Sequence, residues 1–269
     1  MNKRIGFIGC GKMAQAIISG MIKSNITLPN QIIASAKSNQ TLTKVENEYG
    51  ILTTTSNEEV TRFSDFLFLA IKPNLYQEIL EEIKDSVGPE TILITIAAGI
   101  NLSFMEESLG NGAKVVRTMP NTPSLVGEGM SAICVNQNVT QAEMDEILAL
   151  YHSFGKAEIV EEALMDAIPA ISGSSPAYVY MFIEALADGG VLQGIPRHQA
   201  YKLAAQAVLG AAKMVLETEK HPGELKDQVC TPGGATIEAV SALEKHNFRG
   251  AVLTAMEQCT AKTMALSKK

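Results

Sequence analysis

The sequence has few cysteines and histidines, and neither residue type is clustered. The cysteines are widely separated, with no C-x-x-C pair: Cys10, Cys134, Cys230 and Cys259. The histidines are equally scattered: His152, His198, His221 and His246. Metal sites and disulfide frameworks need such residues at close, regular spacings. We therefore expect no bound metal, no disulfide, and reduced thiols that are buried in the fold.

Long apolar runs and an excess of positive charge are also absent. The longest strictly aliphatic or aromatic run is Phe66–Ile71, which is far too short to span a bilayer. Met1 leads almost directly into an expected strand, without a cleavable signal. The net charge of −7 argues against nucleic acid or an anionic membrane as the main partner. These absences predict a soluble cytoplasmic protein.

Residues 1–161 alternate short apolar runs with amphipathic stretches. The apolar runs predict strands at Arg4–Ile8, Gln31–Ala34, Phe66–Ile71, Thr91–Ile96, Lys114–Met119 and Ala132–Val135. The stretches between them predict helices at Met13–Lys23, Gln40–Tyr49, Leu75–Lys84, Leu102–Leu109 and Gln141–Phe154. Apolar strands that alternate with helices are typical of a parallel sheet covered on both faces. We therefore expect an α/β domain with a doubly wound sheet.

From residue 162 onward the pattern changes, and no further strand is expected. Helices are predicted at Pro176–Leu192, Arg197–Glu217, Pro222–Gln228, Pro232–Glu244 and Arg249–Leu266. The first two are apolar nearly all round, and one small domain cannot bury such helices alone. We expect a partner subunit to cover them. Residues 162–269 are therefore predicted to form an all-helical dimerisation domain.

The segment Gly9-Cys10-Gly11-Lys12-Met13-Ala14 follows the first expected strand and opens the first helix. In Rossmann-type folds the first glycine permits a tight turn, and the second lets the backbone approach a pyrophosphate. Ala14 stands at the third glycine position, where the helix meets the strand. This context predicts a dinucleotide site that includes Gly9, Gly11, Lys12 and Met13. The alternative is an ordinary strand–turn–helix.

The end of the second expected strand lacks the carboxylate that NAD-preferring sites use to bind ribose. The chain reads Ala34-Ser35-Ala36-Lys37-Ser38-Asn39 there, and the first acidic residue of the whole sequence is Glu46. Ser35, Lys37 and Ser38 can instead bind a 2′-phosphate. NADP(H) is therefore the favoured cofactor, with NAD(H) as a secondary one; the alternative for Lys37 is a solvated surface lysine.

Three further turns follow expected strands, where ligands of doubly wound sheets bind. They supply the remaining cofactor candidates: Ala70, Lys72, Pro73, Ala97, Ala98, Gly99, Met119, Pro120 and Asn121. Lys72 has two equally favoured interpretations, a catalytic group or a residue that shapes the turn before Pro73. Asn57 is a candidate for the adenosine ribose, and a helix-capping role fits its pattern equally well.

Near the other end of the chain, Thr231-Pro232-Gly233-Gly234-Ala235-Thr236 has the features of an anion-binding helix start. Thr231 is a good N-cap, Pro232 suits the first helical position, and the glycines leave the first N–H groups uncovered. Such groups favour a carboxylate or a phosphate. A cofactor site together with an anion site points to a redox enzyme that acts on a small acid.

No Ser/His/Asp arrangement, metal-ligand set or carboxylate pair stands out in the sequence. Reduction of a C=N bond needs little such machinery, because an imine can arrive already protonated. The enzyme mainly has to bring the hydride donor and acceptor together. Thr236 is the candidate for a hydroxyl near the nitrogen of the C=N bond.

The motifs resemble one family closely. Their order along the chain is that of pyrroline-5-carboxylate reductases: Gly6–Ala14, Lys72-Pro73, Ala97–Ile100, Met119–Pro123, Pro176-Ala177-Tyr178 and Pro232–Thr236. The resemblance covers essentially the whole chain. It implies reduction of 1-pyrroline-5-carboxylate, a cyclic imino acid, to L-proline with NAD(P)H. It also implies homodimers through the helical domain, which in this family often assemble into larger rings.

The resemblance also implies roles for individual residues. Those implied to bind the substrate carboxylate are Thr231, Gly233, Gly234, Ala235 and Thr236; Thr236 also resembles the family's partner of the pyrroline nitrogen. Glu219 matches an acid near the substrate, although its own context favours a solvated helix end. Ser175 replaces a glycine of the family pattern, so the loop must differ if that glycine needs a positive φ.

Two alternatives remain open. One is another NADP-dependent imine or β-hydroxyacid reductase, but the latter class uses a lysine on the first long helix of its second domain. Pro176–Leu192 contains no lysine. The other alternative is a non-catalytic NADP-binding homologue.

Overall fold

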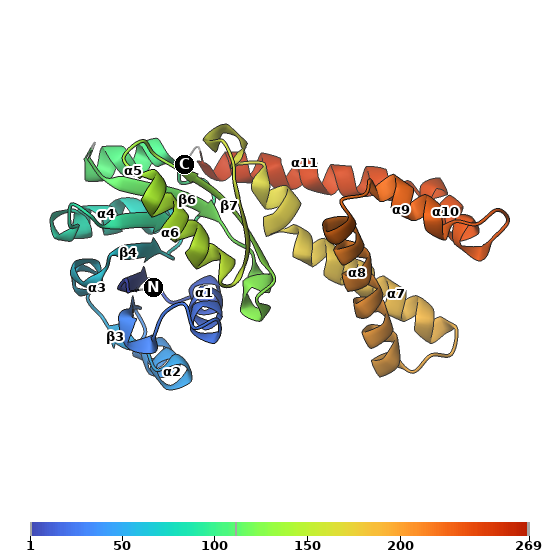
Figure 1. Ribbon diagram of the computed structural model, residues 1–269, viewed down its shortest axis with the longest axis horizontal. Coiled ribbons are helices and arrows are strands. Elements are labelled where there is room, and N and C mark those ends of the chain that lie inside the picture. The colour runs from blue at the N-terminus through green and yellow to red at the C-terminus, as the bar shows by residue number, and fades with distance from the viewer. Residues whose placement is uncertain (1, 111, 268–269) are drawn as a thin grey trace. The chain divides into compact units, whose positions relative to one another are not determined.

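The structure is a computed structural model that describes residues 2–110 and 112–267. The described chain divides into two compact units (Figure 1). The first contains the residues up to Ser174 together with those from Cys259 onward, and the second is Ser175–Gln258. Among the described residues, no helix combines the length and apolar character needed to cross a bilayer.

The first unit is built on one sheet with the strand order β3-β2-β1-β4-β5-β6-β7-β8. Its strands are β1 (Ile5–Ile8), β2 (Ile32–Ser35), β3 (Leu52–Thr54), β4 (Phe66–Leu69), β5 (Ile92–Thr95), β6 (Lys114–Met119), β7 (Gly129–Val135) and β8 (Gly155–Ile159). The chain moves outward from β1 to β3, then returns to add β4 on the other side of β1. This reversal makes the sheet doubly wound, as the sequence predicts.

The expectation of a parallel sheet is wrong at one edge. Strands β1 to β6 are parallel neighbours, but β7 pairs with β6 in the antiparallel sense. A parallel connection needs a crossover of about a dozen residues, usually an α-helix. The chain between Met119 and Gly129 forms only a short 3-10 turn, Thr122–Val126, so β7 returns in the opposite direction. Strand β8 then pairs parallel to β7.

Helices cover both faces of the sheet through two separate apolar clusters. One cluster includes buried residues of α1 (Lys12–Lys23), α2 (Asn39–Tyr49) and α6 (Gln141–His152). The other includes buried residues of α3 (Asn57–Phe63), α4 (Tyr76–Ile83) and α5 (Leu102–Leu109). Every residue of the inner strands β1, β2, β4 and β5 is buried. Continuous apolar strands are required there because neither face of this part of the sheet meets water.

Three elements of the first unit are absent from the sequence prediction: β3, α3 and β8. Strand β3 has only three residues and lies at an edge of the sheet, with no buried side chain. Strand β8 is the opposite edge strand and is also largely exposed. Short, polar edge strands carry little apolar alternation. Helix α3 is a single short segment with only Val60 and Thr61 buried.

The second unit contains α7 (Ser175–Leu192), α8 (Arg197–Thr218), α9 (Pro222–Val229) and α10 (Ala235–Lys245), together with most of α11 (Phe248–Ser267). No strand occurs among its residues, as the sequence predicts. Large apolar side chains are exposed on these helices, among them Met181 at 70%, Leu192 at 85% and Leu216 at 77%. Exposed apolar surface of this extent is typical of an interaction site.

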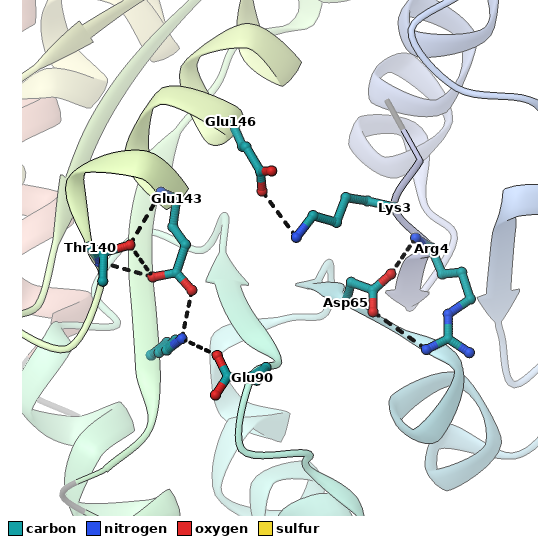
Figure 2. A network of polar contacts seen from close by, with 8 residues as sticks. Lys3, Arg4, Asp65, Glu90, Thr140, Glu143 and Glu146 are labelled. Atoms are coloured by element: carbon teal, nitrogen blue, oxygen red, sulfur yellow. Dashed lines mark hydrogen bonds and ion pairs between the residues drawn. The ribbon is translucent and has the colours of Figure 1, made fainter.

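The amino ends of the strands carry a network of charged side chains, which Figure 2 shows. Lys114, the first residue of β6, contacts the carboxylates of Glu90 and Glu143, each at 2.6 Å. The other carboxylate oxygen of Glu143 accepts a hydrogen bond from the backbone N–H of Thr140 at 2.9 Å, which caps α6. This network ties the start of β6 to the helix beside it.

Candidate active site

The loop between β1 and α1 has a backbone shape that only glycine adopts readily. Gly9 has φ +89°, and its N–H donates to the carbonyl oxygen of Ser35 at 3.1 Å. A Cβ atom on Gly9 would lie 2.6 Å from the carbonyl oxygen of Ala70. The loop therefore packs closely against the carboxyl ends of β2 and β4, which leaves no space for a side chain at Gly9.

Gly11 faces open space instead. It is the N-cap of α1, has an ordinary φ of −75°, and makes no side-chain capping bond. A Cβ atom at this position would meet nothing within 4 Å. The first turn of α1 carries no acidic residue, so its N–H groups and the positive end of the helix dipole favour an anion. This cradle has the donors and the space that a pyrophosphate needs.

A cleft of about 560 Å³ opens at this point in the first unit. Nine of the residues predicted to bind the cofactor line it: Gly11, Lys12, Met13, Ala70, Lys72, Pro73, Ala98, Met119 and Pro120. They come from the loops that follow β1, β4, β5 and β6. Its volume is in the range of cofactor sites, and carboxyl ends of parallel strands are where such sites form.

Besides Gly9, three predicted residues of these loops do not line the cleft. Ala97 is buried, and Gly99 lines a different, smaller pocket. Asn121 is buried as well: its Oδ1 accepts from the N–H of Met130 at 2.8 Å, and its Nδ2 donates to the carbonyl of Ser172 at 3.0 Å. These bonds show that Asn121 braces the loop after β6.

The cleft also has lining residues that sequence reasoning missed. Pro169, Gly173 and Ser174 come from the segment just before α7, and Thr263 comes from the last turns of α11. Ser174 and α11 are joined directly, because the Sγ of Cys259 lies 3.3 Å from the Ser174 hydroxyl. The family pattern that includes Ser175 and Pro176-Ala177-Tyr178 begins next to this segment and gave a signal for it. No pattern in the helical sequence around Thr263 singles that residue out.

The residues proposed for the adenosine end lie at the carboxyl end of β2 and the start of α3. Lys37 is exposed, whereas Ser35 is buried and donates its hydroxyl to Asn57 Oδ1 at 2.7 Å. Asn57 Nδ2 in turn donates to Glu82 at 3.0 Å. Ser56, not Asn57, caps α3. Binding of the 2′-phosphate by Lys37 stays a prediction.

The thiols are free, but not all of them are buried as expected. Cys10 and Cys134 are buried, while Cys230 and Cys259 are partly exposed. Cys10 lies in the glycine loop, and its burial raises the pKa of the thiol to about 11. It is therefore protonated at neutral pH and is not a nucleophile.

The second unit holds the segment predicted to bind the substrate carboxylate, and here one prediction is wrong. Thr231 does not cap the helix: α10 begins at Ala235, with Gly234 as its N-cap. The preceding residues form a turn in which the Gly234 N–H donates to the Thr231 carbonyl at 3.0 Å. Pro232 and Gly233, with φ +66°, suit the two central positions of a type II turn. Because of this turn, the helix begins at Ala235 and not directly after Thr231.

Anion-binding features remain at the corrected helix start. Because the N-cap is a glycine, no N-cap side chain competes for the N–H groups of the first turn. A Cβ atom on Gly234 would lie 2.4 Å from the Thr231 hydroxyl oxygen, so glycine lets that hydroxyl lie against the helix start. The side chain of Thr236 belongs to the same first turn and is partly exposed.

Two other residues were singled out from the resemblance. Glu219 is exposed at the C-cap of α8 and has φ 55°, which agrees with the helix end that its sequence context favours; its contact with the substrate stays a prediction. Ser175 is the first residue of α7 and does not have a positive φ. The backbone here has no need of the family's glycine.

Together these features define a class of protein: a dinucleotide-binding domain with a doubly wound sheet, joined to a helical domain. Residues 4–99 match a family model described as NADP oxidoreductase coenzyme F420-dependent, and residues 162–266 match one described as pyrroline-5-carboxylate reductase dimerisation. The pyrroline-5-carboxylate reductase of Escherichia coli is 47% identical over 268 residues, which covers 100% of both chains. The chain belongs to the pyrroline-5-carboxylate reductase family.

Solved structures of the family are similar over their full length. The Plasmodium falciparum pyrroline carboxylate reductase, solved with NADP bound, has a TM-score of 0.89 and 35% identity, covering 99% of this chain and 98% of that one. The Coxiella burnetii enzyme has a TM-score of 0.90 and 33% identity, covering 100% of each chain. These comparisons confirm the predicted fold class and the family resemblance.

Proposed function

We propose that the chain reduces 1-pyrroline-5-carboxylate to L-proline with hydride from NAD(P)H, the last step of proline synthesis. The observation that carries this proposal is its end-to-end similarity to pyrroline-5-carboxylate reductases. The structure supports it independently, because cofactor residues predicted from four separate loops line one cleft.

The cofactor supplies the hydride, and the first unit holds the cofactor. Gly11 and the first turn of α1 bind the pyrophosphate through backbone N–H groups. The small residues Ala70, Ala98 and Pro120 line the cleft and leave room for ribose and nicotinamide. Lys37 binds the 2′-phosphate, which makes NADP(H) the preferred cofactor and NAD(H) a secondary one.

The second unit holds the substrate. The N–H groups at the start of α10 and the hydroxyl of Thr231 bind its carboxylate, and Thr236 hydrogen-bonds the ring nitrogen. When hydride adds to the carbon of the protonated C=N bond, the electron pair of that bond moves to nitrogen. The product is the secondary amine of proline, so no protein group, Thr236 included, has to donate a proton at that step.

The helical unit is proposed to form a homodimer, while a larger ring of dimers stays an expectation from the family resemblance. Its match to the family's dimerisation model and its exposed apolar side chains support this proposal. The domain boundary between residues 161 and 162 stays a prediction: the dimerisation match begins at residue 162, whereas the compact second unit begins at Ser175. Cytoplasmic location also stays a prediction, which cell fractionation can test.

A direct assay tests the function. Purified protein is expected to oxidise NADPH when 1-pyrroline-5-carboxylate is added, to use NADH less well, and to form proline in equal amount. A comparison variant is Gly11→Trp, a substitution in the first unit that fills the proposed pyrophosphate site. Absence of cofactor oxidation by the unmodified protein would refute the proposal.

A further inference from the structure

The loop that follows β5 forms a wall with two sides. Ile96 and Ala98 face the proposed cofactor cleft. Gly99 and Asn101, from the same loop, line a separate pocket of about 260 Å³. Contacts that hold Gly99 and Asn101 in place therefore also determine the positions of Ile96 and Ala98.

The second pocket contains an ion-pair network between a buried arginine and two partly exposed carboxylates. Arg117 of β6 is only 3% exposed, and its guanidinium contacts Glu162 Oε1 at 3.3 Å and Asp166 Oδ1 at 2.5 Å. All three residues line the pocket. Both carboxylates belong to the segment between β8 and α7, so the network joins that segment to the middle of the sheet.

Glu162 has a second contact, which reaches the loop itself. Its Oε1 atom accepts a hydrogen bond from the backbone N–H of Leu102 at 2.7 Å. Leu102 is the first residue of α5, and the loop Ala97–Asn101 immediately precedes it. One carboxylate oxygen thus fixes the C-terminal end of the loop to Arg117. The N-terminal end is held separately, because the Ala97 N–H donates to Thr95 Oγ1 at 3.3 Å.

The network is poorly arranged for stability alone. The Nε atom of Arg117 is buried and has no hydrogen-bond partner among the described residues. Ion pairs of a buried arginine that keeps an unsatisfied donor contribute little net stability, because the desolvation of its guanidinium opposes them. Its geometry is better explained by the position that it imposes on the loop.

We propose that Glu162 is a positioning residue, which holds the Ala97–Asn101 loop against the cofactor through the Leu102 N–H. The proposal rests on the cofactor site of the proposed function. Arg117, which is itself paired with Asp166, orients the Glu162 carboxylate. The backbone N–H of Leu102 donates to this carboxylate and so transmits the effect to Ala98 in the cleft wall.

The chain offers a matched control on the same strand. Glu143 also pairs with a cation of β6, Lys114, and also accepts from a backbone N–H at a helix start, that of Thr140. It lies at the amino end of β6, the end opposite the cleft. Glu143→Ala therefore removes the same kinds of contact as Glu162→Ala without touching the Ala97–Asn101 loop.

The test measures the Kd for NADPH by direct titration and the melting temperature of the unliganded protein. Glu162→Ala and Glu162→Met both remove the acceptor, and Met also fills its volume. Each is expected to raise the Kd about tenfold, the scale of one lost charge-assisted hydrogen bond. Glu162→Gln keeps an acceptor oxygen for Leu102 but loses the ion pair, so its Kd is expected to stay within about twofold of the unmodified value.

The melting temperature distinguishes an effect on the position of the Ala97–Asn101 loop from an effect on the stability of the protein. Glu162→Gln and Glu143→Ala are both expected to lower it while leaving the Kd within about twofold. An unchanged Kd in Glu162→Ala and Glu162→Met would overturn the proposal, as would an equal loss of affinity in Glu162→Gln or Glu143→Ala. If the unmodified protein binds no NADPH, the proposed function itself fails.

Discussion

A methyl group added at each of the two glycines of the β1–α1 loop is expected to have opposite effects. Gly9 and Gly11 are two residues apart, yet their surroundings differ completely. At Gly9, φ is +89° and a Cβ atom would overlap the Ala70 carbonyl oxygen at 2.6 Å. At Gly11, φ is −75° and a Cβ atom would meet nothing within 4 Å.

The cost of Gly9→Ala follows from these two observations. A side chain at positive φ costs about 1–2 kcal/mol. The overlap cannot be relieved by a rotamer, since the atom it meets is backbone, and such overpacking adds about 1–3 kcal/mol. A total of about 3 kcal/mol corresponds to a melting temperature lower by roughly 6–12 °C for a domain of this size.

Gly11→Ala is expected to leave stability nearly unchanged. The loss of a favourable N-cap residue is offset by the reduced freedom of the unfolded chain, and the two effects are each of order 0.5–1 kcal/mol. The methyl group instead projects into the proposed pyrophosphate cradle, so the Kd for NADPH is expected to rise by about tenfold or more.

Thermal unfolding and NADPH titration of both variants check this pair of predictions. A Gly9→Ala protein that melts like the unmodified one would refute the strain argument. A Gly11→Ala protein with unchanged NADPH affinity would show that the pyrophosphate does not approach this backbone.

Three further predictions concern charge, catalysis and pH. Lys37→Glu is expected to raise the KM for NADPH and lower that for NADH, because a carboxylate repels the 2′-phosphate; an unchanged ratio of kcat/KM values would show that the phosphate binds elsewhere. Thr236→Ala is expected to lower kcat by about 10–100-fold, the scale of one lost transition-state hydrogen bond, and to leave the Kd for NADPH unchanged; Thr236→Ser is expected to retain most activity, and equal loss in both variants would contradict the role of the hydroxyl. Burial by itself would raise the pKa of Glu143, but hydrogen bonds from Lys114 and Thr140 outweigh it and lower the pKa. Stability from this group is therefore present above its unfolded pKa and is lost as pH falls through the lowered folded pKa. Unfolding of Lys114→Met measured from pH 7 to pH 3 is expected to show a weaker loss than the unmodified chain; parallel curves would contradict this.

The features that sequence predicted best depend on residues close together in the chain. The glycine loop is an example, because the spacing of Gly9 and Gly11 after an apolar run already determines the turn and the helix start. The apolar strands were also found, since burial on both faces gives a continuous signal.

The features that were missed or wrong depend on contacts or on competing local structure. Thr231 has the composition of an N-cap, but Pro232 and Gly233 form a turn that places the helix start at Ala235. The direction of β7 depends on a connection too short for a helix. Thr263 lines the cleft because the end of α11, from Cys259 onward, belongs to the first unit, although it is far from the rest of that unit in sequence.

The most direct measurement follows NADPH absorbance and proline formation together in the unmodified protein. The account predicts that 1-pyrroline-5-carboxylate triggers NADPH oxidation with one proline formed for each NADPH consumed. It also predicts that the reaction is lost in a Gly11→Trp control that folds normally. NADPH that binds but is not oxidised in the presence of this substrate would contradict the central claim.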